Sequence, residues 1–177
     1  MKILAISWAS CGSFNREIFR SLSKKNDVKI KVIIPKMFSA SLSLAECDSC
    51  DNENIDIVSL KIKGSNSRYN YYSGVYSVLS DFNPDIVYYE DDPIGVQAIQ
   101  YGIWCYFNKK KFVCRTVQNT SIEFKDEIKR LGMFKGVIYT ALKMVVYKIT
   151  TKLVDHVFTI NNDGLNICKD LGFKSVS

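Results

Sequence analysis

The chain alternates between short apolar runs and longer amphipathic stretches. Runs rich in Ile, Val, Phe and Tyr predict six strands, at residues 3–8, 28–34, 55–62, 85–89, 112–116 and 157–160. Apolar residues that recur at helical spacing predict helices between these runs, at residues 14–23, 71–82, 93–107, 121–131, 133–154 and 163–171. Residues 36–54 are polar and small, and they predict an extended loop with a short helix near residues 42–46.

This alternation of strands and helices predicts the fold class. Ile/Val-rich strands separated by helices are typical of a parallel sheet whose two faces are both covered. We therefore expect an α/β fold: a doubly wound, mainly parallel sheet with helices on both faces, which is a Rossmann-like arrangement. A length of 177 residues suits one domain. Residues 1–177 are thus interpreted as a single Rossmann-like domain.

The predicted sheet also indicates where a ligand would bind. Ligands of open parallel sheets bind beyond the carboxyl ends of the strands. The polar residues that directly follow the predicted strands are Ser10 to Ser13, Glu90 to Asp92, Gln118 with Asn119, and Asn161 with Asn162. Only Gly12 offers a glycine after the first strand, so the spacing of a dinucleotide-binding fingerprint is absent, and no phosphate-binding loop of the Walker type occurs.

Composition narrows the classes of partner. Hydrophobic residues make up 47% and charged residues 24%, which is typical of a globular chain. The net charge of +6 permits an anionic partner such as a phosphate or a membrane surface; we expect no nucleic-acid partner. The longest uncharged stretch has 16 residues, whereas a membrane-spanning helix needs about 20, so we expect no transmembrane segment.

The cysteines and the single histidine predict neither a metal site nor a disulfide framework. Cys47 and Cys50 form a CxxC pair, but the second pair that a zinc site requires is missing. His156 is the sole histidine, at the start of the sixth predicted strand. Cys105 and Cys114 lie in apolar runs, where a free cysteine packs as a small hydrophobic residue. We therefore expect reduced cysteines and a cytoplasmic location.

Two segments carry a resemblance to a known family. Residues 83–93, Asn-Pro-Asp-Ile-Val-Tyr-Tyr-Glu-Asp-Asp-Pro, and residues 112–119, Phe-Val-Cys-Arg-Thr-Val-Gln-Asn, with Gln100 between them, resemble the N-terminal domain of family 4 glycosyltransferases. Residues 1–35 and 154–173 are similar to the same family in order and spacing. The resemblance implies one lobe of the two-lobed glycosyltransferase B fold. In that family a donor-binding lobe would follow, so we expect this chain alone to be inactive.

The resemblance implies a function and a set of site residues. The function is the acceptor side of retaining sugar transfer from a nucleotide-sugar to a glycan, glycolipid or lipid-linked acceptor, as in the synthesis of cell-surface polysaccharides. It implies no cofactor besides the nucleotide-sugar, which is a co-substrate, and it assigns no catalytic residue. The cleft that holds acceptor and donor phosphate is predicted to contain Ser10, Cys11, Gly12, Ser13, Arg16, Glu90, Gln118 and Asn119.

Several of these residues also have a structural interpretation. The acidic residues from Glu90 to Asp92 could offset a helix dipole, Asn119 could cap a loop, and Arg16 could be a solvated charge. If Glu90 binds acceptor hydroxyls, its carboxylate should be partly exposed, and its loss should leave no buried group without a partner. The alternative for the whole chain is a non-catalytic, Rossmann-like binding or interaction module.

The segment from 125 to 152 predicts a membrane contact. It holds seven basic residues and an apolar helix face. Lysines with apolar and tyrosine neighbours suit a lipid headgroup region. We expect Lys129, Arg130, Lys135 and Lys143 to contact an anionic membrane, which would place the protein peripherally on the inner face. The alternative is a core helix with solvated lysines.

Overall fold

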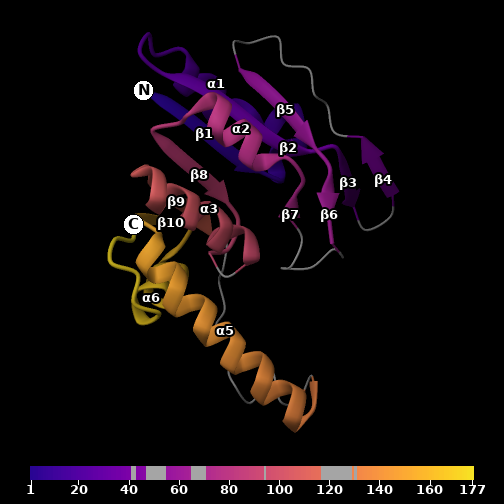
Figure 1. The fold of residues 1–177 in the computed structure, drawn as a ribbon, viewed down its shortest axis with the longest axis vertical. Coiled ribbons are helices and arrows are strands. Elements are labelled where there is room, and N and C mark those ends of the chain that lie inside the picture. The colour runs from indigo at the N-terminus through magenta and orange to yellow at the C-terminus, as the bar shows by residue number, and fades with distance from the viewer. Residues whose placement is uncertain (41–42, 47–54, 65–70, 94, 117–128, 130) are drawn as a thin grey trace.

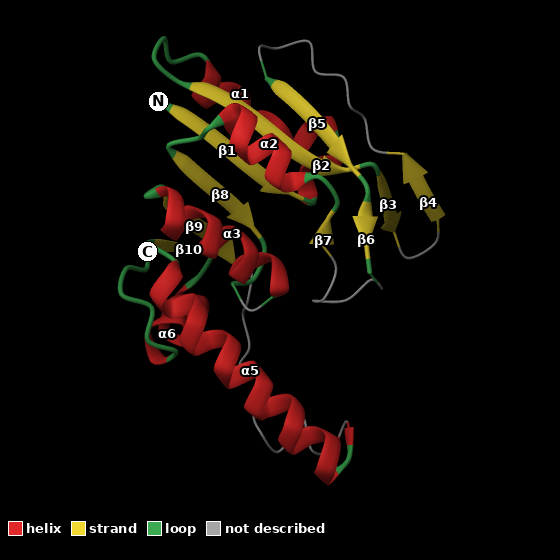
Figure 2. Ribbon diagram, viewed as in Figure 1, coloured by secondary structure: helices red, strands yellow, loops and turns green. Residues whose placement is uncertain are grey.

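The computed structural model describes the chain except residues 41–42, 47–54, 65–70, 94, 117–128 and 130. Its centre is a six-stranded sheet in the order β10-β9-β8-β1-β2-β5, in which every neighbouring pair is parallel (Figure 2). The strands are β1 (Lys2–Ser7), β2 (Lys29–Pro35), β5 (Asp56–Leu60), β8 (Ile86–Glu90), β9 (Lys111–Thr116) and β10 (His156–Thr159). These strands confirm the predicted α/β, doubly wound fold class.

Helices cover the two faces of the sheet unequally. Alternate residues of each strand face opposite sides, and in β1 Leu4 and Ile6 pack in the core with α2 (Val75–Phe82) and α3 (Val96–Asn108). Figure 1 shows α2 and α3 in front of the sheet. The opposite face, which includes Ala5, packs against α1 (Glu17–Ser23) through Phe19.

The last two helices pack at the β10 side of the sheet. α5 (Met133–Leu153) lies against α3, where Gly102 allows a close approach: a Cβ added there would be 2.8 Å from the Cβ of Leu153. α6 (Asn162–Asp170) begins at Asn161, whose side chain accepts a hydrogen bond from the amide of Gly164. Among the described residues, no helix is long and apolar enough to cross a membrane.

Several predicted elements are wrong in detail. The helix expected near residues 42–46 is instead strand β4 (Ser43–Glu46), which pairs antiparallel with β3 (Met37–Ala40). The strand expected at 55–62 divides, because β6 (Ile62–Lys63) leaves the main sheet to pair with β7 (Tyr71–Tyr72). In each case a short neighbouring strand decides the conformation by pairing with the segment, and neither strand is long enough to show a clear apolar alternation in the sequence.

Two helices begin later than predicted. α2 begins at Val75 because Gly74, with a φ of 85°, adopts the left-handed conformation directly before it. α3 begins at Val96 after the extended Gly95, not at Pro93. The segment before α3 is fixed instead by Asp92, which accepts a hydrogen bond from the hydroxyl of Thr116 on β9.

The cysteine prediction is wrong in one place. Cys11 is disulfide-bonded, whereas Cys105, Cys114 and Cys168 are free and buried, as a hydrophobic role predicts. Sequence spacing could not show the disulfide, because it depends on which segments the fold brings together. The CxxC pair lies outside the described residues. Within the described part of the chain, no cluster of three or more His, Cys, Asp or Glu side chains could hold a metal ion.

Candidate functional site

The strand order places a crevice between β1 and β8. The chain leaves β1 into α1 on one face of the sheet, and it leaves β8 into α3 on the other face. Connections that diverge in this way open a crevice at the carboxyl ends of the two strands, where ligands of open α/β sheets bind. Ser7 and Glu90, the last residues of β1 and β8, are paired in register at this point.

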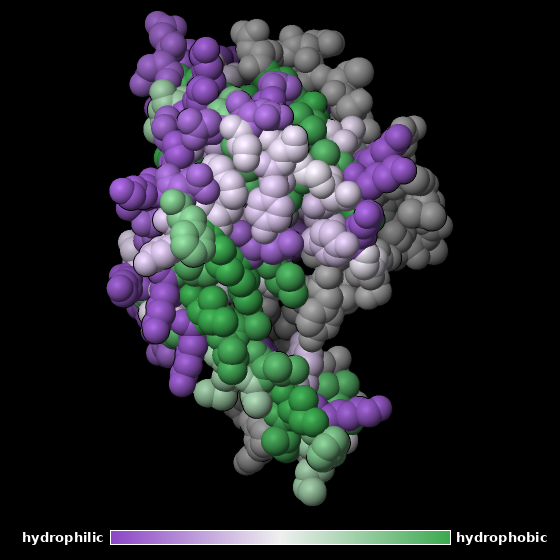
Figure 3. Space-filling view, viewed as in Figure 1, coloured by the Kyte–Doolittle hydropathy of each residue, from purple (hydrophilic) through white to green (hydrophobic). Residues whose placement is uncertain are grey.

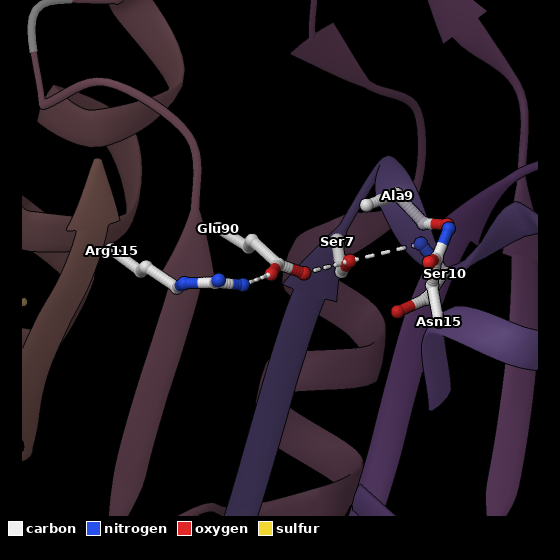
Figure 4. Close-up of polar contacts among 6 residues, drawn as sticks. All are labelled: Ser7, Ala9, Ser10, Asn15, Glu90 and Arg115. Carbon is white, nitrogen blue, oxygen red and sulfur yellow. Dashed lines mark hydrogen bonds and ion pairs between the residues drawn. The ribbon is translucent and has the colours of Figure 1, made fainter. Parts of the chain in front are cut away.

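A chain of polar contacts crosses three strands at the crevice. The hydroxyl of Ser7 donates a hydrogen bond to one carboxylate oxygen of Glu90, and Nη1 of Arg115, on β9, donates to the other (Figure 4). The amide of Ser10 in turn donates to the Ser7 hydroxyl at 3.1 Å. The side chain of Glu90 is 13% exposed and that of Arg115 is 40% exposed, so the ion pair lies at the boundary between core and solvent.

Glu90 therefore has more hydrogen-bond partners within the fold than the sequence predicted, namely Ser7 and Arg115. Because the hydroxyl of Ser7 is fully buried, removal of the carboxylate would leave a buried donor without its partner. The expectation that Glu90 could be lost without this cost is wrong. The dipole interpretation of the acidic residues is not supported either, because the first turn of α3 contains no acidic residue.

The loop after β1 is fixed by a buried arginine. Arg16 has no exposed surface, and it donates hydrogen bonds to the backbone carbonyls of Ser10 (from Nε, 2.8 Å) and Cys11 (from Nη2, 3.2 Å). Asn15 adds a hydrogen bond from Nδ2 to the carbonyl of Ala9 at 2.7 Å. Arg16 is thus neither a solvated charge nor a cleft-lining side chain, and its role is to hold the loop in place.

A pocket opens beside the ion pair. It has a volume of about 710 Å³ and lies between α1 and the part of the sheet that α1 leaves uncovered. Its polar end carries Asn15, Glu17, Glu90 and Arg115, and the rest of the lining is mostly apolar: Ile3, Ile18, Phe19, Leu22, Ile86, Tyr88, Val113 and Phe158. A ligand with a polar end and an apolar body would match this distribution.

Tyr88 contributes a hydroxyl to the pocket. Burial, together with the nearby Glu90 carboxylate, raises the pKa of Tyr88 to about 12, although the hydrogen-bonded Arg115 guanidinium opposes the shift. Tyr88 therefore keeps its proton at neutral pH. The pocket thus presents the carboxylates of Glu17 and Glu90, the amide of Asn15, the Arg115 guanidinium and the neutral Tyr88 hydroxyl. Together these groups can both donate and accept hydrogen bonds.

The structure brings part of the predicted site together. Ser10 and Glu90, which are 80 residues apart in sequence, meet through Ser7. Gly12 and Ser13 are exposed in the same loop, and the backbone of Gly12 is extended, with a φ of −85°. Gln118 and Asn119 lie outside the described residues.

Two residues of the site were missed by the sequence analysis. Ser7 lies inside the first predicted strand and Arg115 inside the fifth, so neither was considered as a residue beyond a strand end. A charged Arg115 within the apolar run Phe-Val-Cys-Arg-Thr was the available signal.

His156 begins β10 at the amino edge of the sheet, where its two ring nitrogens lie within hydrogen-bond distance of the hydroxyls of Ser175 and Ser177.

The comparisons with known proteins show the fold. No family model matches the chain, and no curated protein matches it in sequence. Among solved structures, UDP-GlcNAc 2-epimerase from Neisseria meningitidis, bound to UDP-GlcNAc, aligns with a TM-score of 0.55 at 15% identity, covering 99% of this chain and 45% of that protein. A putative UDP-N-acetylglucosamine 2-epimerase from Listeria monocytogenes aligns with a TM-score of 0.54 at 12% identity, covering 97% and 42%.

A third similar structure is Phytolacca americana UGT2 in complex with UDP-2-fluoro-glucose and pterostilbene. It aligns with a TM-score of 0.53 at 8% identity, covering 93% of this chain and 47% of that protein. The chain spans less than half the length of each of these three proteins. Its fold is Rossmann-like and similar to the glycosyltransferase B type.

Proposed function

We propose that this chain is the acceptor-binding lobe of a retaining glycosyltransferase, which transfers a sugar from a nucleotide-sugar to a glycan, glycolipid or lipid-linked acceptor. The observation that carries the proposal is the contact chain Ser7–Glu90–Arg115 at the β1/β8 crevice of a glycosyltransferase-B-like fold. The resemblance of residues 83–93 and 112–119 to family 4 glycosyltransferases supports the same function. Similar folds in proteins solved with UDP-GlcNAc and UDP-2-fluoro-glucose agree with a nucleotide-sugar as co-substrate.

The pocket chemistry suits an amphiphilic acceptor. A carboxylate has about four lone-pair positions, so Glu90 can accept hydrogen bonds from sugar hydroxyls while it holds Ser7 and Arg115. The guanidinium of Arg115 can donate to sugar oxygens from the same edge. The apolar part of the pocket lining, which includes Ile3, Ile86 and Val113, can contact the hydrophobic part of a lipid-linked acceptor.

The exposed backbone of the loop at Gly12 and Ser13 is the proposed contact for the donor phosphates. Because Arg16 holds the carbonyls of Ser10 and Cys11 inward, the shape of the loop is fixed before any ligand binds. A preorganised loop lowers the entropic cost of binding. The proposal involves no metal ion and no cofactor other than the nucleotide-sugar.

Ligand binding to the chain tests this proposal. Ligand-observed NMR with n-octyl glucoside, below its micelle concentration, and with methyl glucoside should show that the alkyl glucoside binds more tightly. Arg115→Gln should weaken this binding at least fivefold. A matched control is Asp155→Asn, which alters an ion pair with Lys111 at the amino edge of the sheet and should leave binding unchanged. Equal affinities of the two variants would contradict the proposed site.

An enzymatic assay separates the proposal from its alternatives. One of the similar structures is a UDP-GlcNAc 2-epimerase, and a shared fold does not distinguish epimerisation from transfer. The chain is therefore incubated with UDP-GlcNAc, and both nucleotide release and epimerised sugar are measured. Epimerised product at about one turnover per second or faster would refute the acceptor-lobe proposal. Failure to bind any glycoside or nucleotide-sugar would favour the non-catalytic module.

A further inference from the structure

α5 presents an unusually apolar surface. The helix has 21 residues and is about 31 Å long, and it extends away from the sheet in Figure 1. Gly136, Tyr147 and Thr150 are buried along one side of it. At about 100° of rotation per residue, the opposite side carries Phe134, Val137, Ile138, Leu142, Val145 and Ile149.

These outward side chains are well exposed. Phe134 is 79% exposed, Leu142 57% and Val145 54%. Figure 3 shows a continuous hydrophobic band over α5. Soluble monomers seldom expose large contiguous apolar patches, and where they do, the patch often serves an interaction. We call this side of α5, from Phe134 to Ile149, the outward face.

The charges of α5 indicate what the outward face contacts. The helix contains four lysines and neither Asp nor Glu. Lys135, Lys148 and Lys152 are exposed, whereas Lys143 is half-buried on the inner side, with its Nζ 5.9 Å from the centre of the Tyr147 ring. An anionic surface complements this set of charges. A second copy of the chain would instead oppose lysines to lysines across a shared α5 interface, which is unfavourable.

We propose that the outward face of α5 lies in the headgroup region of an anionic lipid bilayer. The apolar side chains would enter the acyl boundary, and Lys135, Lys148 and Lys152 would extend their aliphatic stems along the surface to reach lipid phosphates. The structure changes the set of lysines that the sequence predicted, because Lys143 faces inward, while Arg130 lies outside the described residues. Lys129 is exposed just before the helix and is compatible with the same surface.

Vesicle flotation of the whole chain tests this proposal. The protein should float with vesicles of phosphatidylcholine and phosphatidylglycerol, and much less with pure phosphatidylcholine. High salt should weaken flotation with the anionic vesicles, because salt screens surface charges. Each lysine near an anionic surface strengthens binding roughly fivefold. The triple change of Lys135, Lys148 and Lys152 to Gln should therefore weaken binding on the order of a hundredfold.

Matched controls separate the outward face from general charge and hydrophobicity. Changing Lys24, Lys25 and Lys29 to Gln removes the same charge from three exposed positions elsewhere and should leave most of the binding. Leu142→Asp should abolish flotation, whereas Phe14→Asp, at a side chain that is 90% exposed, should not.

Three results would overturn the proposal. They are equal flotation with neutral and anionic vesicles, flotation with neither, and equal loss in the lysine triple variant and its control. Sedimentation velocity without lipid tests the competing occupant. A dimer that Leu142→Asp dissociates, together with no vesicle binding, would assign the outward face to a second copy of the chain.

Discussion

Replacement of Glu90 by Ala tests whether the contact chain at the crevice contributes to stability. The substitution leaves the fully buried hydroxyl of Ser7 without its acceptor, which costs about 1–3 kcal/mol. It also removes the ion pair with Arg115, whose partly exposed geometry contributes up to about 1 kcal/mol. We expect the free energy of unfolding to fall by about 2–3 kcal/mol. Glu90→Gln, which keeps a carbonyl oxygen as acceptor, should cost about 1 kcal/mol.

Urea denaturation followed by circular dichroism measures these free energies. A double-mutant cycle with Ser7→Ala isolates the Ser7–Glu90 contact, because Glu90→Ala should cost less once the hydroxyl is absent. A coupling energy of about 1–2 kcal/mol is expected. Two results would refute this reasoning. One is a free energy of unfolding for Glu90→Ala within about 0.5 kcal/mol of the wild-type value, and the other is a double variant whose loss of stability equals the sum of the losses of Ser7→Ala and Glu90→Ala.

Two further predictions concern packing and buried tyrosines. Gly102→Ala should lower the free energy of unfolding by about 1 kcal/mol in the same urea assay, because the new Cβ would crowd Leu153 by more than the gain in helix propensity offsets. Gly12→Ala is the control: a Cβ at that position has no atom within 4 Å, so the free energy of unfolding should not fall. Burial is the main cause that raises the pKa of Tyr88 from its ordinary 10.0 to about 12, and the Glu90 carboxylate adds to the shift. Tyr88 therefore loses its proton at a lower pH in the unfolded chain than in the folded protein, so the free energy of unfolding should fall as pH rises from 10 to 12. Tyrosinate absorbance against pH should show a late-ionising group that Tyr88→Phe removes, and ionisation of every tyrosine near pH 10 in the folded protein would contradict this assignment.

For α5, the local sequence pattern predicted the helix but not the side on which it packs. Lysines and apolar residues at helical spacing were sufficient to predict the long helix and its possible contact with lipid. They could not show which side of α5 packs against α3. That orientation depends on the close approach at Gly102, and it is what turns Lys143 inward and Leu142 outward.

Local periodicity determined most of the secondary structure. Strands β1, β2, β8 and β9 and helices α3, α5 and α6 follow the apolar patterns in the sequence to within a few residues, because those patterns reflect one-sided burial of a regular backbone. The patterns failed at the β3–β4 and β6–β7 pairs. Strands of two to four residues are too short to show an alternating apolar pattern, which needs about four to eight residues, and they gain their stability from the partner strand.

The tertiary structure alone decided the site. The sequence showed that Glu90 and the Ser10 loop follow apolar strands, and therefore that they could meet at one edge of a parallel sheet. It could not show that β1 lies between β2 and β8, nor that Ser7 and Arg115 both bind Glu90. Strand order and register are set by long-range packing of the whole core. A hydrogen bond between residues 83 positions apart exists only once that packing is complete.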